Sequence, residues 1–135
     1  MTYLIDTTVF SDLMRDHAGV RARLAELAPT DRVVICSIVR GEVAYGIGRL
    51  PAGRRRADLA TKAAALFSAI RCEPVPPETG DQYAQVKRVL QQAGTSLDEN
   101  DLWFAATALT FGATLVTRDS DFQRIGGLAV ENWSA

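Results

Sequence analysis

Apolar residues change their spacing repeatedly along this chain, and the changes predict strands that alternate with helices. Short runs of consecutive apolar or β-branched residues are typical of buried parallel strands, and they occur at residues 3–5, 33–36 and 113–117. Residues 73–75 and 128–131 are expected to form two further short strands. Between these runs, apolar residues recur every three or four positions, as in amphipathic helices. The pattern predicts the α/β class, with a central parallel sheet flanked by helices on both faces.

Polar and turn-forming residues divide the helical pattern into segments. Six helices are expected. The first follows Asp6, the second runs from Val20 to Leu27, and the third follows Ser37. The fourth ends at Ile70, the fifth runs from Thr79 to Gly94, and the sixth runs from Leu97 to Leu109. Thr7 or Thr8, Ser37 and Thr79 are placed to cap the helices that they precede. The polar break at residues 51–56 separates the third helix from the fourth, so these two are expected to form a protruding hairpin.

Composition indicates one compact unit. The chain has 135 residues, of which 47% are hydrophobic and 23% are charged, so we expect a single domain over residues 1–135 with a full core. The formal net charge of -1 argues against a generally basic, DNA-coating protein. No apolar run approaches the roughly 20 residues of a membrane span, and no basic, apolar leader opens the chain. A soluble, cytoplasmic protein is therefore expected.

Acidic side chains gather where the predicted strands end and the next helices begin. Asp6 follows the first strand, and Asp119 with Asp121 follows the strand at residues 113–117. The others are Glu42, one turn into the helix after the second strand, and Asp98 with Asp101, which share a face at the start of a later helix. Each acid alone could simply cap a helix. At least four of these acids are expected at the sheet edge where ligands commonly bind, and together they predict a functional site instead.

The residue types available favour metal-dependent nuclease chemistry. His17 is the single histidine, and Cys36 and Cys72 are far apart in the sequence. A two-histidine ribonuclease, a Ser-His-Asp triad and a zinc site therefore lack their parts. Clustered carboxylates repel one another unless a cation binds among them, and hard oxygen ligands prefer Mg²⁺ or Mn²⁺. A metal held in this way can activate water and stabilise charge on a phosphoryl group, as phosphodiester hydrolysis requires.

Four segments resemble the PIN domain in order and spacing, and especially the small VapC-type toxins of bacterial toxin–antitoxin pairs. They read L-I-D-T-T-V-F, S-I-V-R-G-E-V-A, N-D-L-W-F-A-A-T-A and L-V-T-R-D-S-D-F, and together they extend over essentially the whole chain. The resemblance implies an endoribonuclease with Mg²⁺ or Mn²⁺ as cofactor and RNA as substrate. It also implies a cognate VapB-type antitoxin as inhibitor, and a homodimer is expected.

The resemblance also assigns roles to individual residues. The family's metal-binding and catalytic acids correspond to Asp6, Glu42, Asp101 and Asp119, with Asp121, Asp98 and Thr117 as accessory residues. Asp98 and Asp101 can each be placed against the third acid of the family, and the N-D-L register favours Asp101.

The helical hairpin at residues 38–70 offers an expected antitoxin site. Tyr45, Ile47 and Leu50 lie near its tip and could contact an apolar antitoxin segment. They could equally close the domain's own core or form a homodimer contact.

Other classes with acids at strand ends fit less well. A receiver domain needs a lysine after a late strand, and neither Lys62 nor Lys87 is near one. A haloacid-dehalogenase-type phosphatase needs a second Asp two residues after the nucleophile, where this chain has Thr8. The remaining alternative is a catalytically silent PIN-like interaction module. Loss of an acid would indicate it, and all four acids are present.

Overall fold

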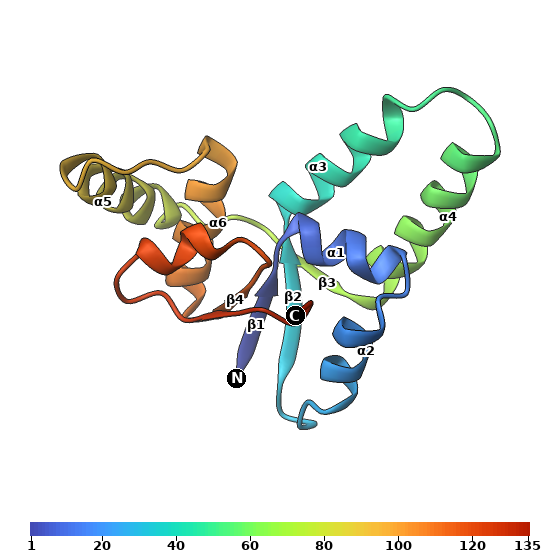
Figure 1. The fold of residues 1–135 in the computed structure, drawn as a ribbon, viewed down its shortest axis with the longest axis horizontal. Helices are drawn as coiled ribbons and strands as arrows, with labels where there is room; N and C mark the ends of the chain where they lie inside the picture. The colour runs from blue at the N-terminus through green and yellow to red at the C-terminus, as the bar shows by residue number, and fades with distance from the viewer.

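The chain folds around a five-stranded parallel sheet. The computed structural model describes residues 1–135, and its strand order β3-β2-β1-β4-β5 places the first strand at the centre (Figure 1). The strands are β1 (Thr2–Ile5), β2 (Arg32–Cys36), β3 (Arg71–Glu73), β4 (Thr114–Val116) and β5 (Val130–Glu131), and every pairing is parallel. The predicted α/β class with a central parallel sheet is confirmed.

Helices lie on both sides of this sheet. They are α1 (Thr7–Met14), α2 (Ala18–Ala25), α3 (Ser37–Gly48), α4 (Arg54–Ala69), α5 (Thr79–Gln92), α6 (Glu99–Phe111) and the short 3-10 helix η1 (Ser120–Arg124). Helices α5 and α6 pack together on one side, and α1 to α4 lie on the other, with α3 and α4 extending outward as the predicted hairpin (Figure 1). None of the helices combines the length and apolar character that crossing a membrane requires.

The central strands and α6 form the part of the core that positions the site. Leu4 and Leu115 of the two central strands are fully buried. The small buried side chains of Ala105 and Ala108 let α6 lie close to the sheet. Gly112 ends α6 with φ 63°, a left-handed conformation that favours glycine, and the chain then turns back into β4. Because α6 and β4 run in opposite directions, the first turn of α6 lies near the end of β4.

Among the boundaries that differ from the prediction, those of β3 and α4 have clear local reasons. Strand β3 occupies Arg71–Glu73 instead of residues 73–75, because it forms where the main chain pairs with residues 34–36 of β2. Arg54, Arg55 and Arg56 form the first turn of α4, although the sequence placed them in the polar break. Arginine has a high helix propensity, so this run can begin a helix directly after the turn at Gly53.

The predicted helix caps were wrong. Asp6, not Thr7 or Thr8, occupies the cap position of α1, and its side chain accepts a hydrogen bond from the first turn. Ser37 and Thr79 are the first helical residues of α3 and α5, and neither helix has a side-chain hydrogen bond at its cap. Strand β2 passes into α3 without an intervening residue, which leaves no separate position for a capping hydroxyl.

Candidate active site

The ends of β1 and β4 bring Asp6 to the carboxyl edge of the sheet, beside the loop that bears Asp119. Asp6 is buried directly after β1, and its main-chain N–H donates to the carbonyl of Val116 at 3.1 Å. Its Oδ1 accepts hydrogen bonds from the Thr8 hydroxyl at 2.7 Å and the Val9 N–H at 3.0 Å. One oxygen of this carboxylate is therefore fixed by helix α1, and the main chain is fixed by β4.

Asp119 is held by hydrogen bonds within its own loop. Its N–H donates to the hydroxyl of buried Thr117 at 3.1 Å, and its Oδ1 accepts from the Asp121 N–H at 2.8 Å. The carboxylate of Asp121 itself pairs with Arg124 at 3.1 Å, at the end of η1. Asp121 thus supports the loop through its main chain, while its charge is already matched by an arginine.

Glu42 is held by two donors that the sequence interpretation did not identify. The Thr7 hydroxyl donates to Oε1, and Nδ2 of Asn100 donates to Oε2 at 2.8 Å. Thr7 opens α1 and Asn100 lies in the first turn of α6, so Glu42 of α3 connects three helices. The sequence signal that could have identified Thr7 and Asn100 is their position directly beside the predicted acids Asp6 and Asp101.

Asp101 is influenced by the charges of four other predicted acids at this edge. It is half-buried in the first turn of α6, and no hydrogen-bond donor acts on its carboxylate. Burial, followed by the negative charges of Asp119, Asp98, Asp6 and Glu42, raises the pKa of Asp101 to about 6. Asp98, by contrast, is exposed at the cap position of α6. The structure therefore brings five carboxylates into one electrostatic neighbourhood.

The donor set suits a hard divalent cation, although it is not a closed cage. All the side chains that act on Asp101 offer carboxylate oxygens, which Mg²⁺ and Mn²⁺ prefer. With the side chains placed as they are, no three His, Cys, Asp or Glu residues are grouped closely enough to enclose a metal ion. The two observations are compatible, because repulsion between charges acts over longer distances than metal–ligand bonds. The carboxylates fit such a cation by their chemistry, and enclosing it would require their side chains to move closer together.

Asp119→Asn is expected to raise the melting temperature of the metal-free protein at pH 7.5. A carboxyl with a raised pKa stabilises the fold below its unfolded pKa and loses that contribution as pH rises through about 6 for Asp101. Among the neighbouring charges, that of Asp119 raises the pKa of Asp101 most, so its removal restores part of the lost stability. After allowance for solvent screening at this half-buried site, we expect roughly 0.5–1 kcal/mol, or about 2–4 °C. Thermal melts in EDTA measure it.

The same melts at pH 4 supply the control. There Asp101 is protonated in the folded protein, so the gain from Asp119→Asn should largely disappear. The Asn side chain keeps an oxygen that can accept the hydrogen bond from the Asp121 N–H, so the cap of η1 is retained. Loss of this cap therefore does not contribute to the change in melting temperature. With Mn²⁺ present, the variant should gain less than the wild type. An unchanged Mn²⁺ increment, together with a lower metal-free melting temperature, would make Asp119 a turn residue only.

Two hollows beside the acids share Glu42 and Thr7. The first is a cleft of about 320 Å³ between α1, α3 and α4, and Ile47 and Leu50 line it, as Met14, Val43 and Leu59 also do. Tyr45 is absent from this lining. It is 69% exposed and lines the second hollow, of about 600 Å³, together with Asn100. The three residues expected to contact an antitoxin are thus divided between the two hollows.

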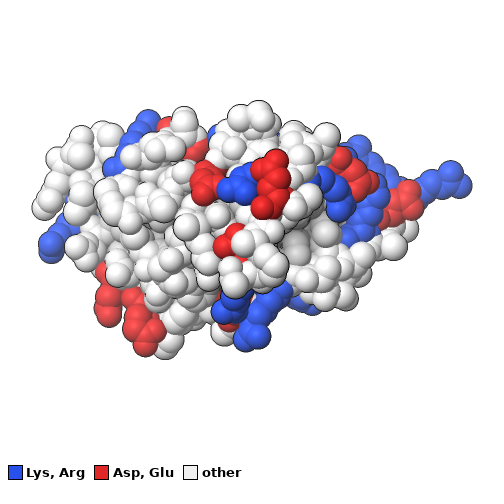
Figure 2. All heavy atoms as spheres, turned by 90° about the horizontal axis from the view of Figure 1, so that it is seen from below, with Lys and Arg blue, Asp and Glu red and all other residues white.

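Basic side chains gather at the α3–α4 hairpin. On the face shown in Figure 2, they concentrate toward the end of the molecule that carries the α3–α4 hairpin. Arg54, Arg55 and Arg56 are all exposed at the start of α4, and Arg49 is exposed at the end of α3. Arg55 lines the cleft of Ile47 and Leu50, whereas Arg49 lines the hollow of Tyr45. Each hollow therefore leads from a carboxylate to an arginine.

Comparison with known proteins gives consistent matches over nearly the full length. Residues 3–128 match the family model of the PIN domain. Ribonuclease VapC1 of Haemophilus influenzae is 30% identical, with 99% of both chains covered, and Ribonuclease VapC2 of Rickettsia felis is 28% identical, with 98% of both covered. A solved structure of VapBC2 from Rickettsia felis, bound to a DNA fragment from their promoter, matches with a TM-score of 0.89 and 27% identity. It covers 98% of this chain and 99% of that chain.

Proposed function

The chain belongs to the PIN-domain family, and we propose that it is a ribonuclease that acts as the toxin of a toxin–antitoxin pair. The full-length relatives named VapC1 and VapC2 are ribonucleases, and the structural relative from Rickettsia felis is part of a VapBC complex. Similarity over nearly the full length of both compared chains supports transfer of this activity.

The observation that supports the activity best is the unneutralised set of carboxylates at one edge of the sheet. Asp101 has no basic partner, and every charge that acts on it is another acid. Structural acids are usually matched, as Asp16 is by Arg21. Leaving several acids unmatched in a half-buried position destabilises a fold, and such strain is found where a ligand relieves it.

Asp6, Glu42, Asp101 and Asp119 would hold the metal, with Asp98 and Asp121 as outer acids. When bound, Mg²⁺ or Mn²⁺ supplies positive charge that polarises a phosphodiester and acidifies water. The chain's own contribution is to fix these side chains. Thr7 and Asn100 orient both oxygens of Glu42, and the hydroxyl of Thr117 fixes the main chain at Asp119.

The arginines near both hollows suit an RNA backbone. A guanidinium group can donate two parallel hydrogen bonds to a phosphate. Arg49 and Arg55 each line a hollow that reaches Glu42, so a bound strand could contact an arginine while one phosphodiester faces the acids. In this proposal the arginine guanidinium groups would bind the RNA backbone, and the carboxylates would remain free to bind the metal.

Cleavage of an RNA pool by the purified, antitoxin-free protein tests the proposal. With Mn²⁺ we expect discrete cleavage products, and with excess EDTA we expect a fall in rate of about 100-fold or more, because the metal supplies charge that the carboxylates alone cannot. Renewed addition of Mn²⁺ should restore the activity. Gel analysis of end-labelled RNA follows the reaction.

A parallel preparation of Asp6→Asn controls for contaminating nucleases, which would cleave in both samples. Undiminished cleavage in EDTA would contradict the metal-dependent mechanism. If the wild type binds its antitoxin but cleaves no RNA in Mn²⁺, the protein would instead be an interaction module with a PIN fold.

The antitoxin of this toxin should be of the VapB type, as in the VapBC complexes that the chain resembles. We assign the apolar cleft between α1, α3 and α4 as its contact site. Ile47 and Leu50 form part of the apolar lining, and Glu42 lies at the same cleft. An apolar segment seated there could bring a basic side chain to the acids and exclude the metal.

A further inference from the structure

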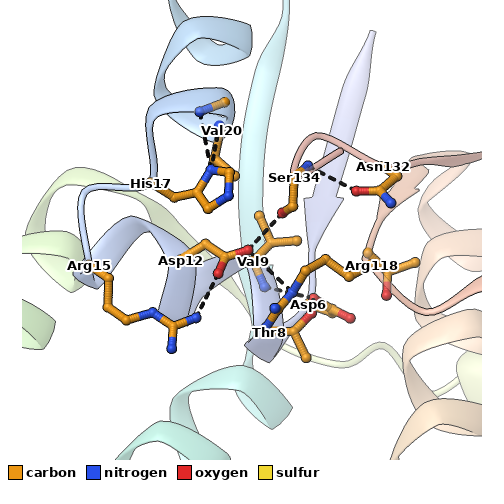
Figure 3. Close-up of polar contacts among 12 residues, drawn as sticks. Asp6, Thr8, Val9, Asp12, Arg15, His17, Val20, Arg118, Asn132 and Ser134 are labelled. Carbon is orange, nitrogen blue, oxygen red and sulfur yellow. Dashed lines mark hydrogen bonds and ion pairs between the residues drawn. The ribbon is translucent and has the colours of Figure 1, made fainter.

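Among the carboxylates that form an ion pair with an arginine, that of Asp12 is the most deeply buried, and it lies outside the proposed metal site. Asp12 lies in α1, and its side chain is only 1% exposed. Its Oδ1 accepts from Arg15 at 2.8 Å, and its Oδ2 accepts from the hydroxyl of Ser134 at 2.7 Å. Nε of Arg118 lies 3.3 Å from the same Oδ2. Figure 3 shows these three groups converging on Asp12 from separate parts of the chain.

The partners of Asp12 compensate the cost of its burial. Burial alone would raise its pKa, but hydrogen bonds from Ser134 and Arg15 and the charges of Arg118 and His17 lower the pKa overall. A buried acid that is matched in this way remains charged and holds its partners firmly. Asp12 therefore differs from Asp101, which is surrounded by like charges.

Arg118 connects Asp12 to the acidic site. It lies between Thr117 and Asp119, in the segment where the Asp119 N–H donates to the Thr117 hydroxyl. The side chain of Arg118 is 44% exposed, and Asp12 is its one ion-pair partner. Asp6 caps the same helix that carries Asp12. The ion pair thus joins the element that bears Asp6 to the loop that bears Asp119.

We propose that Asp12 is a positioning residue. By its ion pair with Arg118 it sets the spacing between Asp6 and Asp119. The proposal rests on the metal-dependent function proposed above. Asp12 does not touch the metal or RNA in this role. It acts on metal affinity through the loop, as residues behind the ligands of metal sites commonly do.

The test measures Mn²⁺ affinity in the absence of RNA, from free Mn²⁺ detected by electron paramagnetic resonance. Asp12→Asn and Arg118→Gln should each weaken Mn²⁺ binding about tenfold, the range typical of residues behind metal ligands. The double variant should be little worse than either single variant, because both break the same contact. Arg118→Lys, which keeps the positive charge, should recover part of the affinity.

Arg21→Gln is the matched control. Arg21 is 51% exposed and pairs with exposed Asp16 at 2.6 Å, so its removal also breaks an arginine–aspartate pair. This pair lies on α2 and the preceding turn, and Arg21 also donates to the carbonyl of Leu13 at 3.4 Å. Neither side chain contacts a predicted metal ligand, so Mn²⁺ affinity should stay unchanged. If Asp12→Asn fails to fold, Arg118→Gln decides the question, because this half-exposed side chain can be replaced without leaving a buried cavity.

Cleavage kinetics separate positioning from direct RNA contact. Positioning predicts a lower kcat for Arg118→Gln, with KM for RNA nearly unchanged. A raised KM with wild-type Mn²⁺ affinity would overturn the proposal and make Arg118 a phosphate contact. Equal Mn²⁺ affinity in the wild type, Arg118→Gln and Arg21→Gln would also overturn it, while leaving the proposed function intact. A wild type that binds no Mn²⁺ would overturn the proposed function and this inference together.

Discussion

Asp101→Asn is expected to reduce RNA cleavage by about 100-fold or more, whereas Asp98→Asn should reduce it by less than about fivefold. Both changes remove one negative charge and keep the shape of the side chain. They differ in location, because Asp101 is half-buried among the acids and Asp98 is exposed at the cap of α6. Initial rates in saturating Mn²⁺, on the RNA that the wild type cleaves, give both ratios.

The two variants control for each other, since they lie one helical turn apart on α6. Metal-free melts should show that Asp101→Asn is at least as stable as the wild type at pH 7.5, because it removes a carboxyl with a raised pKa. A loss of activity therefore could not be ascribed to unfolding. If Asp98→Asn is the more damaging change, the third metal-binding acid is Asp98.

Leu50→Glu is expected to weaken antitoxin binding by about 30-fold or more, the loss typical of a central apolar contact at an interface. Leu50 lines the apolar cleft between α1, α3 and α4, and a carboxylate there would be desolvated by a bound apolar segment. The kcat of RNA cleavage by the free protein should remain within about twofold of wild type, because Leu50 is not one of the proposed metal-binding residues. KM for RNA is expected to rise, because the new carboxylate lies in the cleft that Arg55 lines. Titration of the antitoxin against the cleavage rate measures the change.

Val89→Glu supplies the control for an added surface charge. Val89 is an exposed apolar residue of α5, on the opposite side of the sheet from the cleft. Antitoxin inhibition should be unaffected there. Tyr45→Ala tests the neighbouring hollow. A larger loss from Tyr45→Ala than from Leu50→Glu would locate the antitoxin over the hollow of Tyr45 and Asn100 instead.

The sequence predicted the parts of the fold that depend on burial of apolar runs. The strands beginning near Tyr3, Val33 and Thr114 have apolar residues and polar boundaries of their own, and each was found within a residue or two. Strand β3 was misplaced because Arg71–Glu73 gains its strand character from pairing with β2. Local composition instead drew the prediction toward Val75.

The acids at strand ends were predictable for the same reason as the strands that they follow. Their supporting contacts were not. Asp12 looks like an ordinary polar position of an amphipathic helix, and its partner Ser134 lies 122 residues along the chain. Asn100 is similarly separated from Glu42 by 58 residues. Such contacts depend on how layers pack in three dimensions, and no spacing rule along one chain expresses them.

The central position of β1 in the sheet also affects when, during synthesis, the ribonuclease can become active. A chain leaves the ribosome from its amino terminus, so β1 emerges well before its neighbour β4 and the Asp119 loop. Pairing of such distant strands also opposes a large loop-closure entropy. The nascent chain therefore cannot complete its acidic site until the Asp119 loop has been synthesised, and this delay gives an antitoxin that is already present time to bind.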